Sequence, residues 1–299
     1  MAIFQTLTTA GGATLEYLVS GPPDAPVLLF QPGTPNSAVL FGCVVEPAAK
    51  LGLRTVSYSR PGYGQSTPRP GRSVADAVAD IEAVLDAVGA EEFTTLGWSG
   101  GGPHALAAGA RLPERCRAVA MLAGVAPYPA HGIDFFVGMG EDNVAEFGAA
   151  IGGTAELSPL LETFAAGLAT VTGAGVIEAM AGLLSSVDRA ALTGEFADEM
   201  AAALRRAVLN GIAGWRDDDL AFVKDWGFDL GGITVPVDVW QGRQDRMVPF
   251  EHGQWLAAEV PSAQAHLFAT EGHLSMLSQL PDLLAELRHR AGWPADLPG

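Results

Sequence analysis

The stretch Gly97-Trp98-Ser99-Gly100-Gly101 decides the fold of this chain. The residues before it, Phe93-Thr94-Thr95-Leu96, are apolar or β-branched, which is typical of a buried strand. The residues after it, Pro103 to Ala110, are rich in Ala and Leu and predict a helix with proline in its first turn. A Gly-x-Ser-x-Gly turn between a strand and a helix is typical of a nucleophilic serine, because it exposes the hydroxyl where helix N–H groups favour negative charge.

Strands and helices alternate on both sides of this turn. Helices are expected at Val44–Lys50, Ser73–Val88 (with Ser73 as cap and Asp76 three residues on), Pro103–Arg111, Glu251–Glu259 and Ser275–Arg290. The expected strands are Ile3–Thr9, Ala13–Ser20, Val27–Phe30, Leu53–Ser57, Phe93–Leu96, Arg117–Leu122, Val235–Trp240 and Gln264–Phe268, the first two joined as a hairpin at Gly11-Gly12. This alternation predicts an α/β fold, a mostly parallel sheet with helices on both faces.

The alternation stops near Gly124 and resumes at Val235. Between them the pattern is helical, which predicts an inserted helical cap over residues 125–232 and an α/β core over residues 1–124 and 233–299. An insertion after a strand at the carboxyl end of the sheet would cover the site as a lid. The expected cap helices are Asp134–Ala150, Ala155–Thr170, Gly175–Ser186, Asp188–Asn210 and Asp217–Trp226.

Composition narrows the class of protein. The chain has 299 residues, 48% hydrophobic and 17% charged, which is typical of a globular protein with a large core. Its net charge of −17 argues against nucleic acid as a partner, because phosphates would be repelled. Two cysteines, Cys43 and Cys116, are too few for a disulfide framework, so we expect two buried thiols.

The sequence also bears on location. The start, Met1 to Thr6, lacks the basic and apolar regions of a signal peptide. The least charged stretch, Thr163 to Ile177, is shorter than the roughly 20 apolar residues that span a bilayer. We therefore expect a cytoplasmic protein with no membrane partner. The sequence does not indicate an oligomeric state.

A serine nucleophile needs a base, and the base needs a carboxylate to hold it. After a Gly-x-Ser-x-Gly turn these partners are expected in the order Asp or Glu, then His, each just past a later strand. Asp245 is the only acid in the loop after Val235–Trp240, and His273 is the only histidine just after Gln264–Phe268. The sequence thus predicts Ser99, Asp245 and His273 as a catalytic triad, with Glu271 as the second choice of acid.

The other histidines compete for the role of base. His104 lies one turn beyond Ser99 on the same helix and is interpreted as a packing residue, whereas His131 begins the cap and could reach the pocket. His252, His266 and His289 are interpreted as structural or solvated. No spacing of His, Cys and Asp resembles a metal site, and Arg60–Ser66 lacks the motifs of a phosphate cradle, so we expect no metal and no cofactor.

An acyl-transfer site also needs N–H donors for an oxyanion, each typically worth about 3–4 kcal/mol. Gly100 N–H, directly after the nucleophile, is the first predicted donor. The second is expected from Gln31-Pro32-Gly33-Thr34-Pro35, where the prolines cannot donate, so Thr34 N–H is predicted and Gly33 is the alternative. The expected substrate pocket comprises Gly33, Trp98, Phe135, Phe136 and Met139, although each alone also fits a core position.

Together these motifs resemble the α/β-hydrolase superfamily, in the branch with a helical cap between the sixth and seventh strands. The resemblance covers nearly the whole chain and rests on the Ser99 turn, Arg60–Ser66, Gly242–Asp245 with Val248-Pro249, and Gly272-His273. It implies an eight-stranded sheet and the triad above. Epoxide hydrolases and haloalkane dehalogenases in the superfamily carry aspartate where this chain has Ser99, which argues against those activities. The loop that begins Gln31-Pro32-Gly33 also departs from the His-Gly-Gly-Pro-Gly loop of iminopeptidases.

The predicted function is hydrolysis of a small carboxylic ester through an acyl-enzyme. Ser99 attacks, His273 moves the proton, Asp245 orients His273, and a small molecule is the only expected partner. Four alternatives remain open at this point. The same triad supports perhydrolysis, amide or peptide cleavage, and C–C bond cleavage, and a hydrolase-like receptor with little turnover would share the fold.

Overall fold

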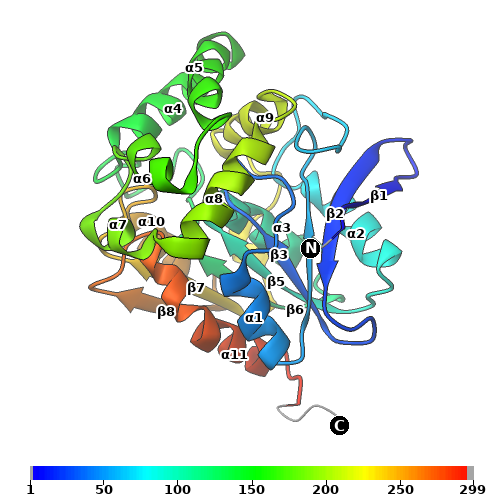
Figure 1. Ribbon diagram of the computed structural model, residues 1–299. Coiled ribbons are helices and arrows are strands. Elements are labelled where there is room, and N and C mark those ends of the chain that lie inside the picture. The colour runs from blue at the N-terminus through cyan, green and yellow to red at the C-terminus, as the bar shows by residue number, and fades with distance from the viewer. Residues whose placement is uncertain (1–2, 295–299) are drawn as a thin grey trace.

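An eight-stranded sheet forms the centre of the computed structural model, which describes residues 3–294 (Figure 1). Its strands are β1 (Gln5–Thr8), β2 (Thr14–Ser20), β3 (Val27–Gln31), β4 (Arg54–Tyr58), β5 (Phe93–Trp98), β6 (Cys116–Leu122), β7 (Val237–Gly242) and β8 (Ala263–Phe268). Their order in the sheet is β1-β2-β4-β3-β5-β6-β7-β8. β1 and β2 pair antiparallel, as does β2 with β4, and all later pairs are parallel. The predicted α/β class and mostly parallel sheet are confirmed.

Core side chains of β3 alternate between the two faces of the sheet because successive residues of a strand point in opposite directions. Leu29 packs in one apolar cluster with Ile81 of α2 (Ala77–Ala87). Leu28 packs in the other with Leu284 of α11 (Leu280–Arg290). α3 (Gly102–Arg111) and α10 (Phe250–Glu259) contribute to the first cluster, and α1 (Gly42–Lys50) to the second. Helices therefore cover both faces, as expected.

The helix expected over Ser73–Val88 begins later, at Ala77. Both the backbone N–H and the hydroxyl of Ser73 donate to the Asp76 carboxylate, at 2.6 and 2.9 Å. The pairing of Ser73 with Asp76 thus forms, but it closes a turn before the helix instead of capping it. The helix expected over Ser275–Arg290 likewise divides into a 3-10 turn, η4 (Ser275–Gln279), and α11.

The segment between β6 and β7 is helical, and within residues 3–294 it contributes no strand to the sheet. Its helices are α4 (Glu141–Gly152), α5 (Thr154–Leu168), α6 (Val176–Ala179), α7 (Ser186–Ala191), α8 (Gly194–Ala207) and α9 (Ala213–Phe222), with 3-10 turns η2 (Gly173–Gly175) and η3 (Leu230–Gly232). Figure 1 shows α4 to α9 gathered on one side of the molecule, beyond the edge of the sheet. We keep the name cap for residues 125–232; its division from the core as a domain stays a prediction.

Four predicted cap helices are wrong in extent. The helix expected at Asp134–Ala150 begins only at Glu141, and the one expected at Asp217–Trp226 lies earlier, at Ala213–Phe222. The helix expected at Gly175–Ser186 ends at Ala179, and the next begins at Ser186, where the Ser185 hydroxyl accepts the N–H of Asp188. The helix expected at Asp188–Asn210 is divided because Thr193, with extended dihedrals of −136° and 164°, separates α7 from α8. A side-chain cap at Ser185 and an extended backbone at Thr193 therefore break what composition indicated as continuous helix.

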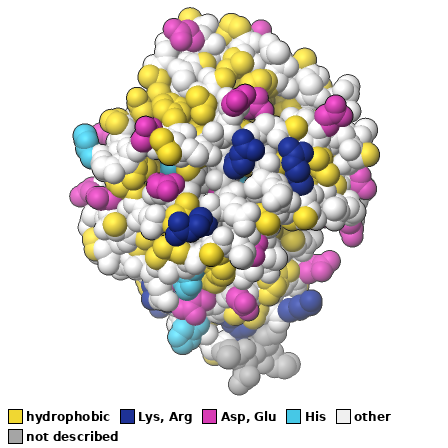
Figure 2. Space-filling view, turned by 90° about the vertical axis from the view of Figure 1, so that its left-hand side faces the viewer, with side chains coloured by type: hydrophobic (Ala, Val, Ile, Leu, Met, Phe, Trp, Pro, Cys, Tyr) yellow, Lys and Arg dark blue, Asp and Glu magenta, His cyan; other side chains and the backbone are white. Residues whose placement is uncertain are grey.

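The surface carries mixed charges. Figure 2 shows acidic and basic side chains interspersed on the face that carries α4 to α7, with apolar side chains gathered in its upper part. Val137, Val144 and Ile151 are among the exposed large apolar residues of the chain. Cys116 is buried and Cys43 half-buried, and the two are free thiols. Across residues 3–294, no helix combines the length and apolar character needed to cross a membrane.

Candidate active site

Ser99 lies at the turn between β5 and α3 in a left-handed backbone conformation, with φ of 55°. Such a conformation costs a non-glycine residue on the order of 1–3 kcal/mol and persists where the surroundings impose it. Close packing imposes it here: a Cβ on Gly101 would lie 1.9 Å from the Gln31 carbonyl oxygen, and one on Gly97 would lie 2.5 Å from the Gly101 carbonyl oxygen. The glycines of the Gly-x-Ser-x-Gly turn thus let β3, β5 and α3 meet around the serine.

His273 and Asp245 meet at the ends of β8 and β7. His273 Nδ1 lies 2.8 Å from Asp245 Oδ2. The other carboxylate oxygen accepts the N–H groups of Met247 and Val248, both at 2.8 Å, and Gln241 Nε2 donates to Oδ2 at 3.1 Å. These bonds fix the carboxylate, which in turn holds one nitrogen of the imidazole and leaves the other for chemistry.

Two opposing effects act on the pKa of His273. Burial, the largest, lowers it because the charged imidazolium is desolvated. The Asp245 carboxylate raises it by charge and by hydrogen bonding, and Asp188 raises it further, so that the net shift is upward from 6.5. The ring also lies 5.7 Å from that of Trp98, beside the serine. The surroundings therefore favour a histidine that accepts a proton.

The loop after β3 lies against Ser99. A Cβ on Gly33 would lie 3.1 Å from Ser99 Cβ, and one on Gly100 would lie 3.1 Å from the Thr34 nitrogen. The predicted oxyanion donors, Gly100 and Thr34, are thus neighbours next to the serine. Their role as donors stays a prediction.

A cavity of about 360 Å³ joins these groups, since Ser99, His273, Gly33, Thr34 and Trp98 all line it. Its other walls come mainly from the cap, with Asn36 and Met247 added by core loops, and they are mainly apolar with a polar strip along α4 and α5. The apolar residues include Phe164, Leu168, Met180, Leu183, Met200, Leu204, Trp215 and Met247, and the polar ones Asn36, Asp142, Asn143, Glu146 and Thr163.

Three predicted pocket residues are wrong. Phe135, Phe136 and Met139 do not line this cavity. Phe135 is buried, with its ring 5.2 Å from Phe147 and 4.7 Å from His252, and its carbonyl lies 2.9 Å from His252 Nε2. This start of the cap packs back onto α10, so its aromatic residues form core and the pocket wall comes from later helices.

The competing histidines lie outside this cavity as well. His104 is buried, and desolvation lowers its pKa to about 4, so it is neutral at physiological pH. Burial also lowers the pKa of His252. His266 contacts Asp238 at 3.0 Å, and His131 uses its carbonyl to accept the Trp255 indole N–H. Among the histidines of residues 3–294, His273 is the one that lines the cavity together with Ser99.

Sequence reasoning missed a set of buried cap carboxylates. Asp217, Asp218 and Asp219 on α9 are between 0% and 2% exposed, and Asp188 on α7 is 0% exposed. A run of acids in a helix usually indicates a solvated face. The sequence signal against a solvated face is a set of arginines that pair with these acids, Arg60, Arg72 and Arg216.

Glu146, on the polar strip of the cavity, pairs with a second buried acid. The Glu146 carboxyl accepts the Trp215 indole N–H at 2.6 Å and faces the Asp219 carboxyl. Burial raises the pKa of both groups, and the Glu146 charge raises that of Asp219 further. Both effects disfavour the ionised form of the two carboxyls in this desolvated place. Among the described residues, no group of three or more His, Cys, Asp or Glu side chains is arranged to hold a metal ion.

Comparison with known proteins agrees with this geometry. A family model for the alpha/beta hydrolase fold matches residues 26–279, and the chain belongs to this family.

Individual proteins are also similar to this chain in sequence or in fold. A 2-hydroxy-6-oxononadienedioate/2-hydroxy-6-oxononatrienedioate hydrolase from Cupriavidus pinatubonensis is 28% identical over 253 residues, which cover 78% of this chain and 74% of that protein. Among solved structures, a bromoperoxidase from Bacillus anthracis has a TM-score of 0.69 at 21% identity, covering 97% of this chain and 100% of that one. An esterase from Rhodococcus has a TM-score of 0.65 at 20% identity, covering 97% and 98%. The two structures share the fold.

Proposed function

We propose that this hydrolase cleaves an uncharged carboxylic ester through an acyl-enzyme formed on Ser99. The observation that carries the proposal is the 2.8 Å bond between His273 and Asp245 at the cavity that Ser99 also lines. A serine hydroxyl becomes nucleophilic when a base so held takes its proton.

The proposed steps follow from these positions. The Ser99 oxygen attacks the acyl carbonyl as His273 takes the hydroxyl proton, and the oxyanion that forms is bound by the N–H groups of Gly100 and Thr34. His273 then protonates the leaving alcohol, which departs and leaves an acyl ester on Ser99. Water, deprotonated by His273, releases the acid and restores the serine. Asp245 stabilises the imidazolium in both halves.

The walls of the cavity favour a neutral, largely apolar substrate. No arginine or lysine is among the described residues that line it, whereas Asp142 and Glu146 are. A substrate carboxylate would leave water for an apolar cavity without a cation to pair it, which is costly.

Cleavage of a C–C bond is the second candidate, and it is supported by the relative named for a dienedioate and a trienedioate. A dioate carries two carboxylates, and the acidic strip on α4 disfavours both. Ester cleavage and C–C bond cleavage would both use the triad. The two candidate reactions differ in the charge of the substrate.

Fluorophosphonate labelling followed by intact mass tests the nucleophile, with Ser99→Ala as the matched control. We expect one adduct on the wild type and none on the variant. A panel of neutral aryl and alkyl esters, their carboxylate-bearing analogues and a dienedioate then tests the substrate. Faster turnover of the dienedioate than of every neutral ester would overturn the ester assignment. A folded wild-type protein that takes up no label would overturn the mechanism and favour the receptor alternative.

A further inference from the structure

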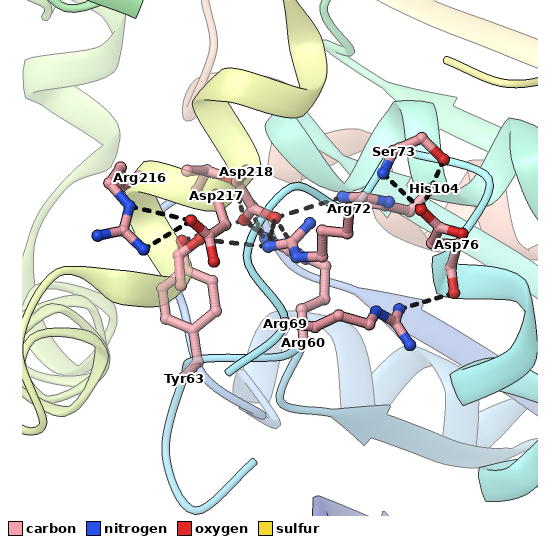
Figure 3. Close-up of polar contacts among 12 residues, drawn as sticks. Arg60, Tyr63, Arg69, Arg72, Ser73, Asp76, His104, Arg216, Asp217 and Asp218 are labelled. Atoms are coloured by element: carbon pink, nitrogen blue, oxygen red, sulfur yellow. Dashed lines mark hydrogen bonds and ion pairs between the residues drawn. The ribbon is translucent and has the colours of Figure 1, made fainter. Parts of the chain in front are cut away.

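Asp218 is a fully buried carboxylate that the cap inserts among residues of the core (Figure 3). It lies on α9, and its hydrogen-bond partners come from two connections, the loop after β3 and the long segment between β4 and α2; His104 of α3 lies 3.5 Å away. Arg60 and Arg72 contact it at 2.7 and 2.6 Å, Tyr63 donates its hydroxyl at 3.0 Å, and Thr34 donates its hydroxyl at 2.8 Å. One cap side chain thus joins the loop after β3 to both ends of the segment between β4 and α2.

The loop that carries Thr34 is held twice by this cluster. Thr34 bonds Asp218 directly, and Arg60, itself oriented by Asp218, donates to the carbonyl oxygens of Pro32 at 2.8 Å and Gly33 at 3.2 Å. The Arg60 guanidinium also lies 3.1 Å from the Thr34 hydroxyl. The peptide groups on both sides of Gly33, including the one that carries the Thr34 N–H, are therefore held by Arg60.

The charge of Asp218 is essential to this arrangement. The two guanidiniums hold the pKa of the carboxyl well below its ordinary value although burial opposes ionisation. A buried charge is tolerated only when it is paired and hydrogen-bonded, and removing one partner strands the others. The cluster is therefore a rigid polar unit beneath the loop.

We propose that Asp218 is a positioning residue for catalysis, which holds the Thr34 N–H in place to bind the oxyanion. This inference rests on the proposed function. Oxyanion donors act because they are fixed before the reaction, and loss of one donor typically costs about 10²–10³ in kcat. The cap, through one carboxylate, is then part of the catalytic apparatus as well as the wall of the pocket.

Asp218→Asn tests this proposal against Arg206→Met as the matched control. Arg206 on α8 pairs with Glu16 on β2 at 2.5 Å, so both variants break an ion pair between cap and core, but Arg206 has no bond to the Thr34 loop. We expect Asp218→Asn to lower kcat for a neutral ester about 10- to 100-fold with little change in KM, because only transition-state binding is lost. The kcat of Arg206→Met should stay within about twofold of wild type, because Arg206 bonds Glu16 and not the loop that carries Thr34.

Thr34→Val gives a second, milder variant that removes the hydroxyl but keeps the N–H. Asp218→Asn should cost less in the Thr34→Val background than in the wild type, because both changes remove the same link. Equal costs in both backgrounds, or a folded Asp218→Asn protein with unchanged kcat, would overturn the proposal. If Asp218→Asn does not fold, Thr34→Val serves as the test. A Thr34→Val protein whose kcat and loop amide exchange equal those of the wild type would then overturn the proposal.

Hydrogen exchange separates this proposal from the proposed function. Amide exchange of residues 33–37 should be faster in Asp218→Asn than in Arg206→Met, whatever the substrate is. A wild type that neither takes up fluorophosphonate nor turns over an ester would contradict the function, whereas equal exchange in the two variants would contradict the positioning role.

A separate observation concerns the loop that carries His273. The N–H groups of Leu274 and Ser275 both donate to Asp188 Oδ1, at 2.7 and 3.0 Å, and the Ser185 hydroxyl donates to Oδ2 at 2.7 Å. A Cβ on Gly272 would lie 2.4 Å from this carboxylate. The loop therefore wraps around a carboxylate supplied by α7.

We infer that Asp188 positions the His273 loop and supports the imidazolium during the reaction. The other charged groups around His273 are Asp245, bonded to its ring, Asp142 and Glu146 on the cavity wall, and Glu271 in its own loop. Asp188 is the one that binds the loop backbone on both residues after the histidine.

Asp188→Asn is the informative variant, because its amide oxygen still accepts both N–H groups while the charge is lost. We expect the pKa of His273, followed by NMR of the labelled imidazole and by the acid limb of kcat/KM, to fall relative to wild type. Glu271→Gln is the control, as it removes a charge from the same loop without touching the backbone N–H groups, and its shift should be smaller. Asp188→Ala should lower kcat further than Asp188→Asn. Equal pKa values of His273 in Asp188→Asn and wild type would overturn the electrostatic role of Asp188. The NMR titration measures this pKa whether or not the protein hydrolyses an ester.

Discussion

His273 Nδ1 and Asp245 Oδ2 lie 2.8 Å apart, and the carboxylate is held by bonds from its own loop. The chain contains a second His–Asp pair, on the two strands that precede these loops, since His266 on β8 contacts Asp238 on β7 at 3.0 Å. The second pair lies within the strands, away from the residues that line the cavity. The two pairs allow the catalytic contribution of a His–Asp bond to be separated from its structural one.

Asp245→Asn should lower kcat by around 10⁴, because an amide donates where the carboxylate accepts and stabilises the wrong tautomer of His273. Asp238→Asn is the matched control and should leave kcat near wild type while lowering the melting temperature. Steady-state kinetics on a neutral ester and thermal unfolding of both variants make the comparison. Equal losses of kcat would mean that Asp245 acts on stability alone.

Two variants of Ser99 should be equally inactive but should differ in stability. Ser99→Ala should lower kcat by on the order of 10⁶. Ser99→Gly should be equally inactive but more stable than Ser99→Ala by about 1 kcal/mol, because glycine adopts a φ of 55° without a Cβ clash. Chemical denaturation measures the difference. A Ser99→Ala protein that is the more stable of the two would show that the left-handed turn is not strained.

The pH dependence follows from the raised pKa of His273. The base acts in its neutral form, so kcat/KM should fall with decreasing pH through a pKa that lies above 6.5. Stability has the opposite sign. A histidine whose pKa is raised by folding stabilises the folded state fully below its unfolded pKa, and this contribution is lost as the pH rises through the folded value. A rate profile that is flat from about pH 5 to 8 would contradict the assignment of His273 as base.

The sheet and the places of the proposed triad residues after its strands were predictable because both depend on local patterns. Buried parallel strands such as β3 are continuous apolar runs, and their order along the chain fixes where the turns after β5, β7 and β8 meet. Ser99, Asp245 and His273 follow from this order alone. The cap helices are less regular because side-chain caps, such as Ser185 on Asp188, compete with helix composition.

The pocket wall and the buried carboxylates could not be predicted in the same way. Phe135 and Trp215 are both large aromatic residues, and the sequence does not distinguish them. Tertiary packing places Phe135 in the core and Trp215 on the cavity wall. Asp218 is indistinguishable from its neighbours Asp217 and Asp219 until its partners from distant loops are placed around it. Such contacts join residues as far apart as 34 and 218, and no local period encodes them.

Selectivity for neutral substrates should depend on Asp142. Its carboxylate lines the cavity on α4, one turn before Glu146, whose pKa is raised by burial. Asp142→Asn removes a full charge with little change in shape, so it should raise kcat/KM for a carboxylate-bearing ester by roughly three- to tenfold, the effect of one charge at moderate distance and intermediate dielectric. The neutral isostere of that ester should be hydrolysed at the wild-type rate, and added salt should narrow the difference between the two substrates in the wild type. Glu141→Gln, which removes a charge from the exposed residue next in sequence, is the control and should leave the ratio of the two rates unchanged. An equal ratio in Asp142→Asn and wild type would mean that the apolar wall excludes anions without help from the charge on α4.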